Sequence, residues 1–267
     1  MRADYQYVLV QQDNAVLTIT MNRPTVLNAI NSQMLEELNE IADEAATDAA
    51  IRCVVLQGAG RAFGAGQDLS EFKAYYASED VDAGPLGEHL LGYHRLARTL
   101  HEMPKPVVAV LHGVATGVSL NLAFACDLRI AADTTRFSEA FARIGLVPDG
   151  GGAYFLTRLV GVAKALEISL LADEFNGAEA ERLGLINKCV PLAELEATVA
   201  AFTQRLAQGP TYTYGLIKHL TYYAHDHDLQ EVFHLESALQ DKAFRTADHR
   251  EGVQAFFEKR APRYSGK

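Results

Sequence analysis

Short apolar runs and amphipathic stretches alternate through the first half of the chain. Aliphatic and β-branched residues predict strands at 7–10, 15–20, 53–57, 106–111 and 128–132. Between them, apolar residues at helical spacing predict helices at 34–45 and 90–103, and Asn31 or Ser32 can cap the first. Such alternation is typical of βαβ units, so the pattern predicts an α/β fold with a largely parallel sheet.

From Gly152 onward the pattern is helical, apart from a short predicted strand at 186–190. We place a boundary near residue 195, which separates a core of residues 1–195 from a helical region of residues 196–267. The second half carries more apolar surface than an isolated appendage can bury, which indicates contacts between subunits. The apolar residues concerned are Leu195, Val199, Phe202, Leu206, Phe233, Leu235 and Leu239.

Charge and composition narrow the possible partners. The 267 residues are 49% hydrophobic, enough for one sizeable core, and carry a net charge of −10. Nucleic acids and anionic membranes both favour basic proteins, so we expect neither as a partner. No apolar run approaches the roughly 18 residues of a membrane span, and the start of the chain lacks a secretory signal pattern. The three cysteines, none in a Cys-x-x-Cys pair, fit buried reduced thiols and a cytoplasmic location.

Three glycine-containing stretches are candidates for a binding site. They are Phe63–Leu69, Gly113–Asn121 and Gly145–Gly152, and the first two follow predicted strands. Glycine lets the backbone approach a ligand closely, and a helix that begins after a strand offers N–H groups without helical partners. Two such turns could form an oxyanion hole, although glycine turns after strands are also ordinary connections.

Asp149 is the carboxylate of greatest interest, because it lies between Pro148 and three glycines. Pro-Asp-Gly is a turn sequence, and an aspartate here can also cap the following helix. The residues alone leave a turn, a cap and a catalytic base open. A metal site at His225-Asp226-His227 is disfavoured, since this patch is polar and links helices. Ser119 lacks the Gly-x-Ser-x-Gly setting of a serine nucleophile.

These motifs, in this order, resemble the crotonase (enoyl-CoA hydratase/isomerase) superfamily. The resemblance covers almost the whole chain, through Asn22-Arg23-Pro24, Leu27-Asn28-Ala29, Arg61-Ala62-Phe63, Gly66-Gln67-Asp68, Pro104–Ala109, Cys126–Arg129, Phe137, Gly145-Leu146 and Phe256…Glu258-Lys259-Arg260. It implies a spiral ββα core at 1–195 that binds acyl-CoA and a C-terminal helical trimerisation region at 196–267. Homotrimers, or homohexamers built from two trimers, are the expected assemblies.

The resemblance also implies roles for particular residues. The backbone N–H groups of Gln67 and Val118 would form the oxyanion hole for a thioester. The residues expected to contact the acyl-CoA are Ala65, Gln67, Asp68, Leu69 and Phe141, with Phe256 and Lys259 reaching from a neighbouring subunit. Val118 and Ser119 replace glycines of the family pattern, but a backbone donor survives these changes. No metal and no separate cofactor is expected, since coenzyme A is part of the substrate.

Two positions decide which reaction is expected. Hydratases of the family place glutamates where this chain has Asn121 and Phe141, and neither of these can act as an acid or a base. Asp149 instead matches the single carboxylate of certain isomerases. The nearest resemblance is to the ring-epoxide isomerase of phenylacetate degradation, which also acts on 3-enoyl-CoA esters. We therefore expect an enoyl-CoA isomerase of fatty acid or phenylacetate metabolism, with Asp149 as its base.

Other functions stay open at this point. An enoyl-CoA hydratase with a different water-activating group is the main alternative. A non-catalytic scaffold of the same fold, binding acyl-CoA or RNA, is a second, and the acidic charge balance argues against RNA. An aryl-CoA dehalogenase is disfavoured, because its tryptophan is replaced by Phe141 and this chain contains no tryptophan.

Overall fold

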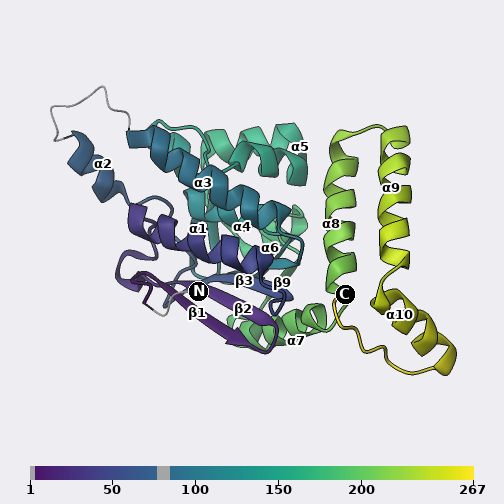
Figure 1. Cartoon of the computed structure of the whole chain (residues 1–267). Helices are drawn as coiled ribbons and strands as arrows, with labels where there is room; N and C mark the ends of the chain where they lie inside the picture. The colour runs from purple at the N-terminus through teal and green to yellow at the C-terminus, as the bar shows by residue number, and fades with distance from the viewer. Residues whose placement is uncertain (1–3, 77–84) are drawn as a thin grey trace.

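A six-stranded sheet forms the centre of the computed structural model, which describes residues 4–76 and 85–267 (Figure 1). The strand order is β1-β2-β3-β4-β6-β9. These strands are β1 (Val8–Asp13), β2 (Val16–Met21), β3 (Cys53–Gly58), β4 (Val107–Leu111), β6 (Leu128–Ala132) and β9 (Lys188–Val190). β1 pairs antiparallel with β2, and each later pair is parallel. The expected α/β class with a largely parallel sheet is confirmed.

A second, smaller sheet joins β5 (Val114–Thr116), β7 (Arg136–Ser138) and β8 (Phe175–Asn176). The sequence analysis missed it, because strands of two or three residues are too short to display an alternating pattern. β5 leads directly into α4 (Gly117–Ala125) and pairs parallel with β7. The carboxyl ends of these two strands therefore lie at the same edge, which places the residues after β7 near the start of α4.

Helices cover both faces of the main sheet. α1 (Ser32–Thr47) begins at the predicted cap, where the Asn31 side chain accepts a hydrogen bond from the Met34 N–H at 3.0 Å. Its apolar stripe packs on β2 and against α3 (Pro85–Glu102). α7 (Leu195–Ala207) packs on the other face, below the sheet in Figure 1.

The position of α7 corrects one expectation about apolar surface. Successive strand residues point to opposite faces, so Val55 and Val108 face away from α1 and need their own cover. α7 supplies that cover. Four residues that we expected at subunit contacts pack on this face instead, namely Leu195, Val199, Phe202 and Leu206. The predicted boundary at residue 195 thus falls at the first residue of a helix that packs on the core.

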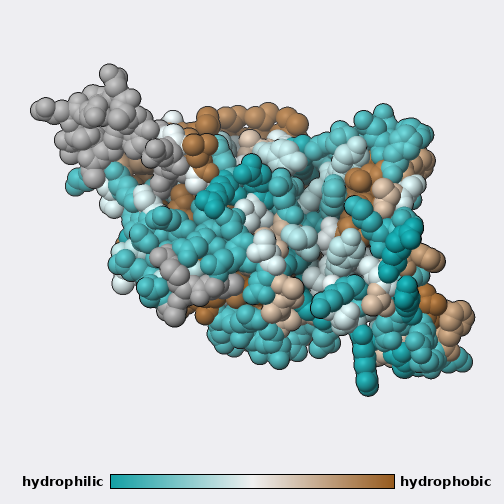
Figure 2. Space-filling view, in the orientation of Figure 1, coloured by the Kyte–Doolittle hydropathy of each residue, from teal (hydrophilic) through white to brown (hydrophobic). Residues whose placement is uncertain are grey.

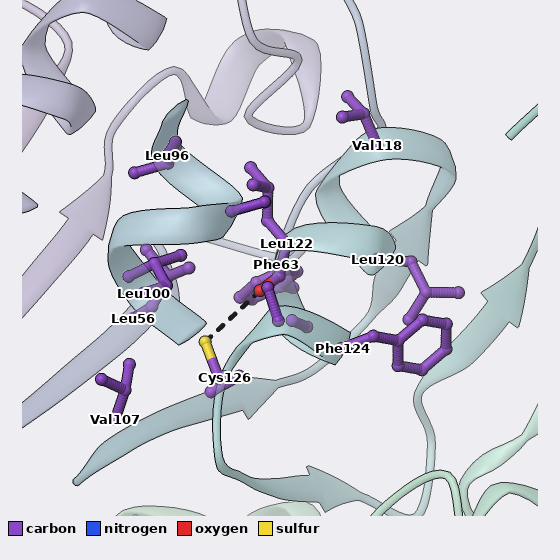
Figure 3. Close-up of a cluster of buried hydrophobic side chains, with 14 of the residues drawn as sticks. Leu56, Phe63, Leu96, Leu100, Val107, Val118, Leu120, Leu122, Phe124 and Cys126 are labelled. Atoms are coloured by element: carbon purple, nitrogen blue, oxygen red, sulfur yellow. Dashed lines mark hydrogen bonds between the residues drawn. The ribbon is translucent and has the colours of Figure 1, made fainter. Parts of the chain in front are cut away.

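α4 runs through the middle of the core, and its residues from Val118 to Ala125 are all buried. A helix that is buried on every side has no face in contact with solvent. In Figure 3, Leu122 lies among side chains of α3 and β3, while Val118 stands apart at the beginning of the helix. The Cys126 thiol donates a hydrogen bond to the Leu122 carbonyl at 3.4 Å. Packing along the whole of α4 therefore fixes the position of its first turn.

The remaining elements flank this core. They are α2 (Leu69–Tyr76), α5 (Gly152–Leu171), α6 (Gly177–Arg182) and the short 3-10 helices Pro24–Val26, Ala140–Ile144 and Leu192–Glu194. α8 (Thr211–Asp226), α9 (Leu229–Phe244) and α10 (Ala247–Glu258) form a separate layer at the right of Figure 1. Partly buried Asp127 joins α8 to the core, accepting hydrogen bonds from Lys218 Nζ at 2.8 Å and the Tyr222 hydroxyl at 2.7 Å.

Exposed apolar side chains recur on α5 and on the C-terminal helices. On α5, Val162, Leu166 and Leu170 recur every four residues and are 65%, 52% and 70% exposed. Figure 2 shows brown patches over α5 and on the C-terminal helices. In the two described ranges, no helix is long and apolar enough to cross a membrane.

Candidate active site

Backbone hydrogen bonds join the first two glycine stretches. The Gly64 N–H donates to the Val114 carbonyl, and the Thr116 N–H donates to the Gly64 carbonyl, each at 3.0 Å. Gly66 has a φ of +87°, and a methyl group on it would lie 3.2 Å from the Thr116 oxygen and 3.7 Å from the Val118 nitrogen. Glycine is required here because the two turns are in close contact and the backbone is left-handed.

The turn around Gln67 is fixed from several sides. The Ile30 N–H donates to the Gly66 carbonyl at 2.8 Å, and the Asp68 N–H donates to the Ile30 carbonyl at 2.9 Å. The Gly66 N–H donates to the buried Ser119 hydroxyl at 3.0 Å. The Ser119 side chain, which replaces a family glycine, thus ties this turn to α4.

The Asn-Arg-Pro and Leu-Asn-Ala motifs support the same turn. The Asn28 amide is fully buried and donates to the Ala59 and Ala62 carbonyls at 2.9 and 2.8 Å. Arg23 donates to Asp68 at 2.8 Å, a partly buried ion pair. These motifs therefore shape the loop before Gln67, a role that sequence reasoning did not assign to Asn28 or Arg23. Ala65 is half-buried in this turn, and Leu69 is 49% exposed at the start of α2.

Val118 brings the second backbone donor to this place. It lies in the first turn of α4, where N–H groups have no partner within the helix, and the Thr116 side chain does not cap that turn. Its side chain packs against the third glycine stretch, since a methyl group on Gly150 would lie 2.8 Å from Val118 Cγ2. The structure therefore brings the turn of Gln67, Val118 and the loop before α5 together.

Asp149 occupies the turn directly before α5. Its carbonyl accepts hydrogen bonds from Asn121 Nδ2 at 2.9 Å and from the Gly152 N–H at 2.8 Å. The N-cap of α5 is Gly151, without a side-chain capping bond, so the helix-cap interpretation of Asp149 is wrong. Asp149 Oδ1 is buried and has no hydrogen-bond partner among the described residues. Burial raises the pKa of this carboxyl to about 6, which suits a base that works near neutral pH.

A second carboxyl, which the sequence analysis did not single out, lies near Asp149. Glu139 follows β7, is fully buried, and has neither oxygen hydrogen-bonded among the described residues. Burial first, and then the charge of Asp149, raises its pKa to about 8, and the Asn121 amide opposes this rise. In the sequence, only the acidic side chain marks Glu139 as a candidate, because the short strand β7 before it was not predicted.

Phe141 and Tyr93 line the same region. Phe141 is buried, and its Cζ would lie 3.9 Å from a methyl group on Gly117. Tyr93 on α3 is also buried and donates a hydrogen bond to Gln67 Oε1, while Gln67 Nε2 donates to Glu71 at 2.9 Å. Burial, followed by the charge of Asp149, raises the pKa of the Tyr93 hydroxyl. Sequence reasoning missed Tyr93, whose helical spacing only indicates a core position.

The remaining predicted contacts are not brought to this place within one chain. Phe256 is 79% exposed on α10, and Lys259 is exposed at the end of that helix. In Figure 1, α10 and α2 lie at opposite sides of the molecule. Neighbouring Arg260 forms an ion pair with Glu251 at 2.6 Å, whereas Lys259 and Arg263 make no ion pair within the described residues.

The chemistry available at the site is that of backbone donors and carboxyl groups. In the described part of the chain, no three His, Cys, Asp or Glu side chains converge where a metal ion could bind. Two N–H groups next to a carboxylate of raised pKa could stabilise an oxyanion and move a proton beside it.

Known proteins share this organisation. The family model for enoyl-CoA hydratase/isomerase matches residues 11–267. The 1,2-epoxyphenylacetyl-CoA isomerase of Escherichia coli is 38% identical over 98% of this chain and 99% of its own length. A Rhodobacter capsulatus protein assigned to the enoyl-CoA hydratases is 38% identical over the same shares of the two chains. A solved Streptomyces coelicolor structure, also assigned as an enoyl-CoA hydratase, is 33% identical with a TM-score of 0.94 and covers 100% of this chain and 97% of its own.

These matches confirm the crotonase fold expected from the motifs, including its C-terminal helical region. They include both an isomerase and assigned hydratases, so they define the kind of enzyme without choosing the reaction. The chain belongs to the enoyl-CoA hydratase/isomerase family.

Proposed function

We propose that this protein is an acyl-CoA isomerase that moves a double bond from the 3- to the 2-position, or rearranges a ring-epoxide acyl-CoA. The main support for this proposal is the half-buried Asp149 carboxyl beside the turns of Gln67 and Val118. Its pKa is raised, and its Oδ1 has no hydrogen-bond partner among the described residues. The similarity to the 1,2-epoxyphenylacetyl-CoA isomerase of Escherichia coli supports the same choice.

The proposed mechanism uses one base. The thioester oxygen accepts hydrogen bonds from the N–H groups of Gln67 and Val118, which stabilise the negative charge that develops there. Asp149 takes a proton from the carbon next to the thioester carbonyl and forms a dienolate. The resulting carboxylic acid returns that proton to the far carbon, so the double bond shifts with no net gain or loss of protons. Phe141 shields the dienolate from water.

Hydration is the alternative, and the surroundings of Asp149 argue against it. Adding water to a double bond needs acid and base groups on the attacking water. Asn121 cannot titrate, and Phe141 cannot form a hydrogen bond with water through its side chain. Glu139, a second carboxyl near Asp149, is 0% exposed and so has no direct access to a water in the site.

We also propose that the enzyme works as a homotrimer or homohexamer. The exposed apolar side chains on α5 and on the C-terminal helices, among them Leu166, Phe233 and Phe257, support such contacts. In this assembly Phe256 and Lys259 of one subunit would contact the coenzyme A bound to another. Residues 196–267 would then act as the oligomerisation region and residues 1–195 as the catalytic core.

A turnover panel tests the reaction assignment. The protein is incubated separately with a 2-enoyl-CoA, a 3-enoyl-CoA and a ring-epoxide acyl-CoA, and the products are separated by chromatography. The proposal expects conversion of the 3-enoyl or ring-epoxide thioester without incorporation of labelled water oxygen. Hydration of the 2-enoyl-CoA as the fastest reaction would establish the hydratase alternative, and binding without turnover of any thioester would establish a scaffold.

A further inference from the structure

Four buried polar atoms without hydrogen-bond partners gather on three neighbouring residues. Among the described residues, the side-chain atoms concerned are Asn121 Oδ1, both oxygens of Glu139 and Asp149 Oδ1. Buried polar atoms are normally bonded, because an unpaired one loses its water without replacement. Asp149 Oδ1 belongs to the candidate base and can be left for the substrate. The orphan atoms of Asn121 and Glu139 need a different explanation.

The Asn121 side chain interacts with both the Asp149 turn and Glu139. Its Nδ2 donates to the Asp149 carbonyl at 2.9 Å, so this amide end is already committed to the turn of the base. A methyl group on Gly152 would lie 2.2 Å from Nδ2, which shows how closely the amide fits against the start of α5. The Asn121 amide also acts on Glu139, whose pKa it lowers after burial and Asp149 have raised it.

The fold explains why Glu139 reaches this place. β7 runs parallel to β5, and β5 continues into α4, so the residue after β7 lies near the helix that carries Asn121. The Thr116 hydroxyl fixes this edge by donating to the Ser138 carbonyl at 2.8 Å. Glu139 is the N-cap of the next 3-10 helix but makes no capping bond, so its carboxyl is not used for local structure.

We propose that Glu139 is a positioning residue that stays protonated and donates a hydrogen bond to Asn121 Oδ1, thereby fixing the amide that holds the Asp149 turn. A single proton on Glu139 then gives a hydrogen bond to both Glu139 and Asn121 Oδ1, because a carboxylic acid can donate whereas a carboxylate only accepts. A neutral Glu139 also adds no second negative charge near Asp149, whose own charge helps to raise the pKa of Glu139. This inference rests on Asp149 as the base of the proposed isomerase.

Infrared spectroscopy tests the protonation without using activity. At pH 7 the C=O stretch of a buried carboxylic acid should be present in the wild type, absent in Glu139→Gln, and retained in Asp149→Asn. The last variant is the matched control, since it removes the other carboxyl of the cluster. A band that disappears in Asp149→Asn, or no such band at all, would overturn the proposal. This result is independent of whether the enzyme isomerises any thioester.

Kinetics test the positioning role. Glu139→Met keeps a similar length but has no donor, so kcat should fall by about tenfold, the kinetic equivalent of one hydrogen bond, with KM little changed. Glu139→Gln keeps a donor and should recover most of that loss. Activity lost equally in both variants would mean that the carboxyl itself reacts. Full kcat in a Glu139→Met protein of lowered melting temperature would reduce Glu139 to a purely structural role.

Discussion

The Asn121 amide holds the main chain of Asp149, and not its carboxyl, through a 2.9 Å hydrogen bond to the Asp149 carbonyl. The turn is held further by the Gly152 N–H, which donates to the same carbonyl. Because both bonds end on the backbone, the Asp149 side chain can be replaced without removing what fixes its position. This separation allows the catalytic role to be tested apart from the fold.

Asp149→Asn should abolish the proton transfer and keep the turn. A positioned general base typically contributes about 10²- to 10⁴-fold, so kcat for a 3-enoyl-CoA should fall by that amount. Binding of a saturated acyl-CoA should change little, because the expected oxyanion donors are backbone groups. Steady-state kinetics and calorimetric titration measure the two quantities. Near-normal turnover in the folded variant would remove Asp149 as the base.

Asp149→Ala is the companion variant, and it tests stability. A helix cap would lose about 1 kcal/mol on truncation. The structure gives no capping bond to Asp149, and burial of its carboxyl is unfavourable to the charged form. We therefore expect the melting temperature at neutral pH to stay level or to rise. A clear decrease would show that the side chain supports the turn after all.

The pH dependence of catalysis should report the same carboxyl. Asp149 must be ionised to accept a proton, and burial raises its pKa from 3.8 to about 6. kcat/KM should therefore be low in acid, rise through about pH 6 and stay level up to about pH 8, where Glu139 loses its proton, since this ratio follows the free enzyme. Glu139→Gln, measured in parallel, should keep this acid limb. A limb centred near pH 4 would indicate an unperturbed carboxyl or another base.

The sequence predicted the main sheet because its strands are long enough to show apolar runs, as in 53–57 and 106–111. It also predicted the Asn31 cap, whose side chain acts within three residues of its own position. The small sheet was missed because β5, β7 and β8 are only two or three residues long. Such short segments show no alternation of apolar and polar residues.

The same distinction applies to the site. The glycine turns could be recognised since their backbone requirements are local, as the left-handed Gly66 illustrates. Glu139 and Tyr93 could not, because their importance comes from packing against Asn121 and Gln67 on other elements. The helix-cap alternative for Asp149 failed for a related reason. Two glycines separate it from the first turn of α5, and the chain turns at Gly151 before the helix begins.

Stability should also depend on pH through Glu139. Its pKa is raised from 4.5 to about 8, so the folded protein holds a proton that the unfolded chain has lost between these values. The free energy of unfolding should therefore fall as pH rises through this window, by at most about 1.4 kcal/mol per pH unit, and level off above it. Asp149 contributes in the same direction between 3.8 and about 6.

Urea unfolding at about pH 5, 6.5 and 8.5 measures this dependence. Glu139→Gln removes the titrating group and should flatten most of the curve between the last two conditions, where Asp149 contributes only the end of its titration. If the free energies of unfolding of the wild type and the variant depend on pH in the same way, Glu139 is ionised in the folded protein.

Assembly is expected to depend on the exposed apolar surface of the C-terminal layer. Phe233 on α9 is 48% exposed, whereas Leu239 of the same helix is buried within the chain. Sedimentation at micromolar concentration should give a trimer or a hexamer. Phe233→Glu should shift the distribution toward smaller species, because a charge would be buried at the contact. Leu9→Glu, at a 52% exposed position of edge strand β1, is the control. A monomeric wild type would contradict the proposal.

Lys259→Ala should weaken coenzyme A binding more than it slows the chemistry. A cation on a phosphate stabilises the bound substrate and the transition state equally, so KM should rise about three- to tenfold with kcat unchanged. Lys188→Ala, another exposed lysine, is the control. Because α10 lies across the chain from α2, the effect should come from a neighbouring subunit.

Trimers reassembled from Asp149→Asn and Lys259→Ala subunits would then contain sites with an intact base and an intact lysine. At low substrate concentration, the turnover of these mixed trimers should exceed the sum of the turnovers of the two variants measured separately. Turnover equal to that sum would mean that Lys259 contacts coenzyme A within its own chain or does not contact it.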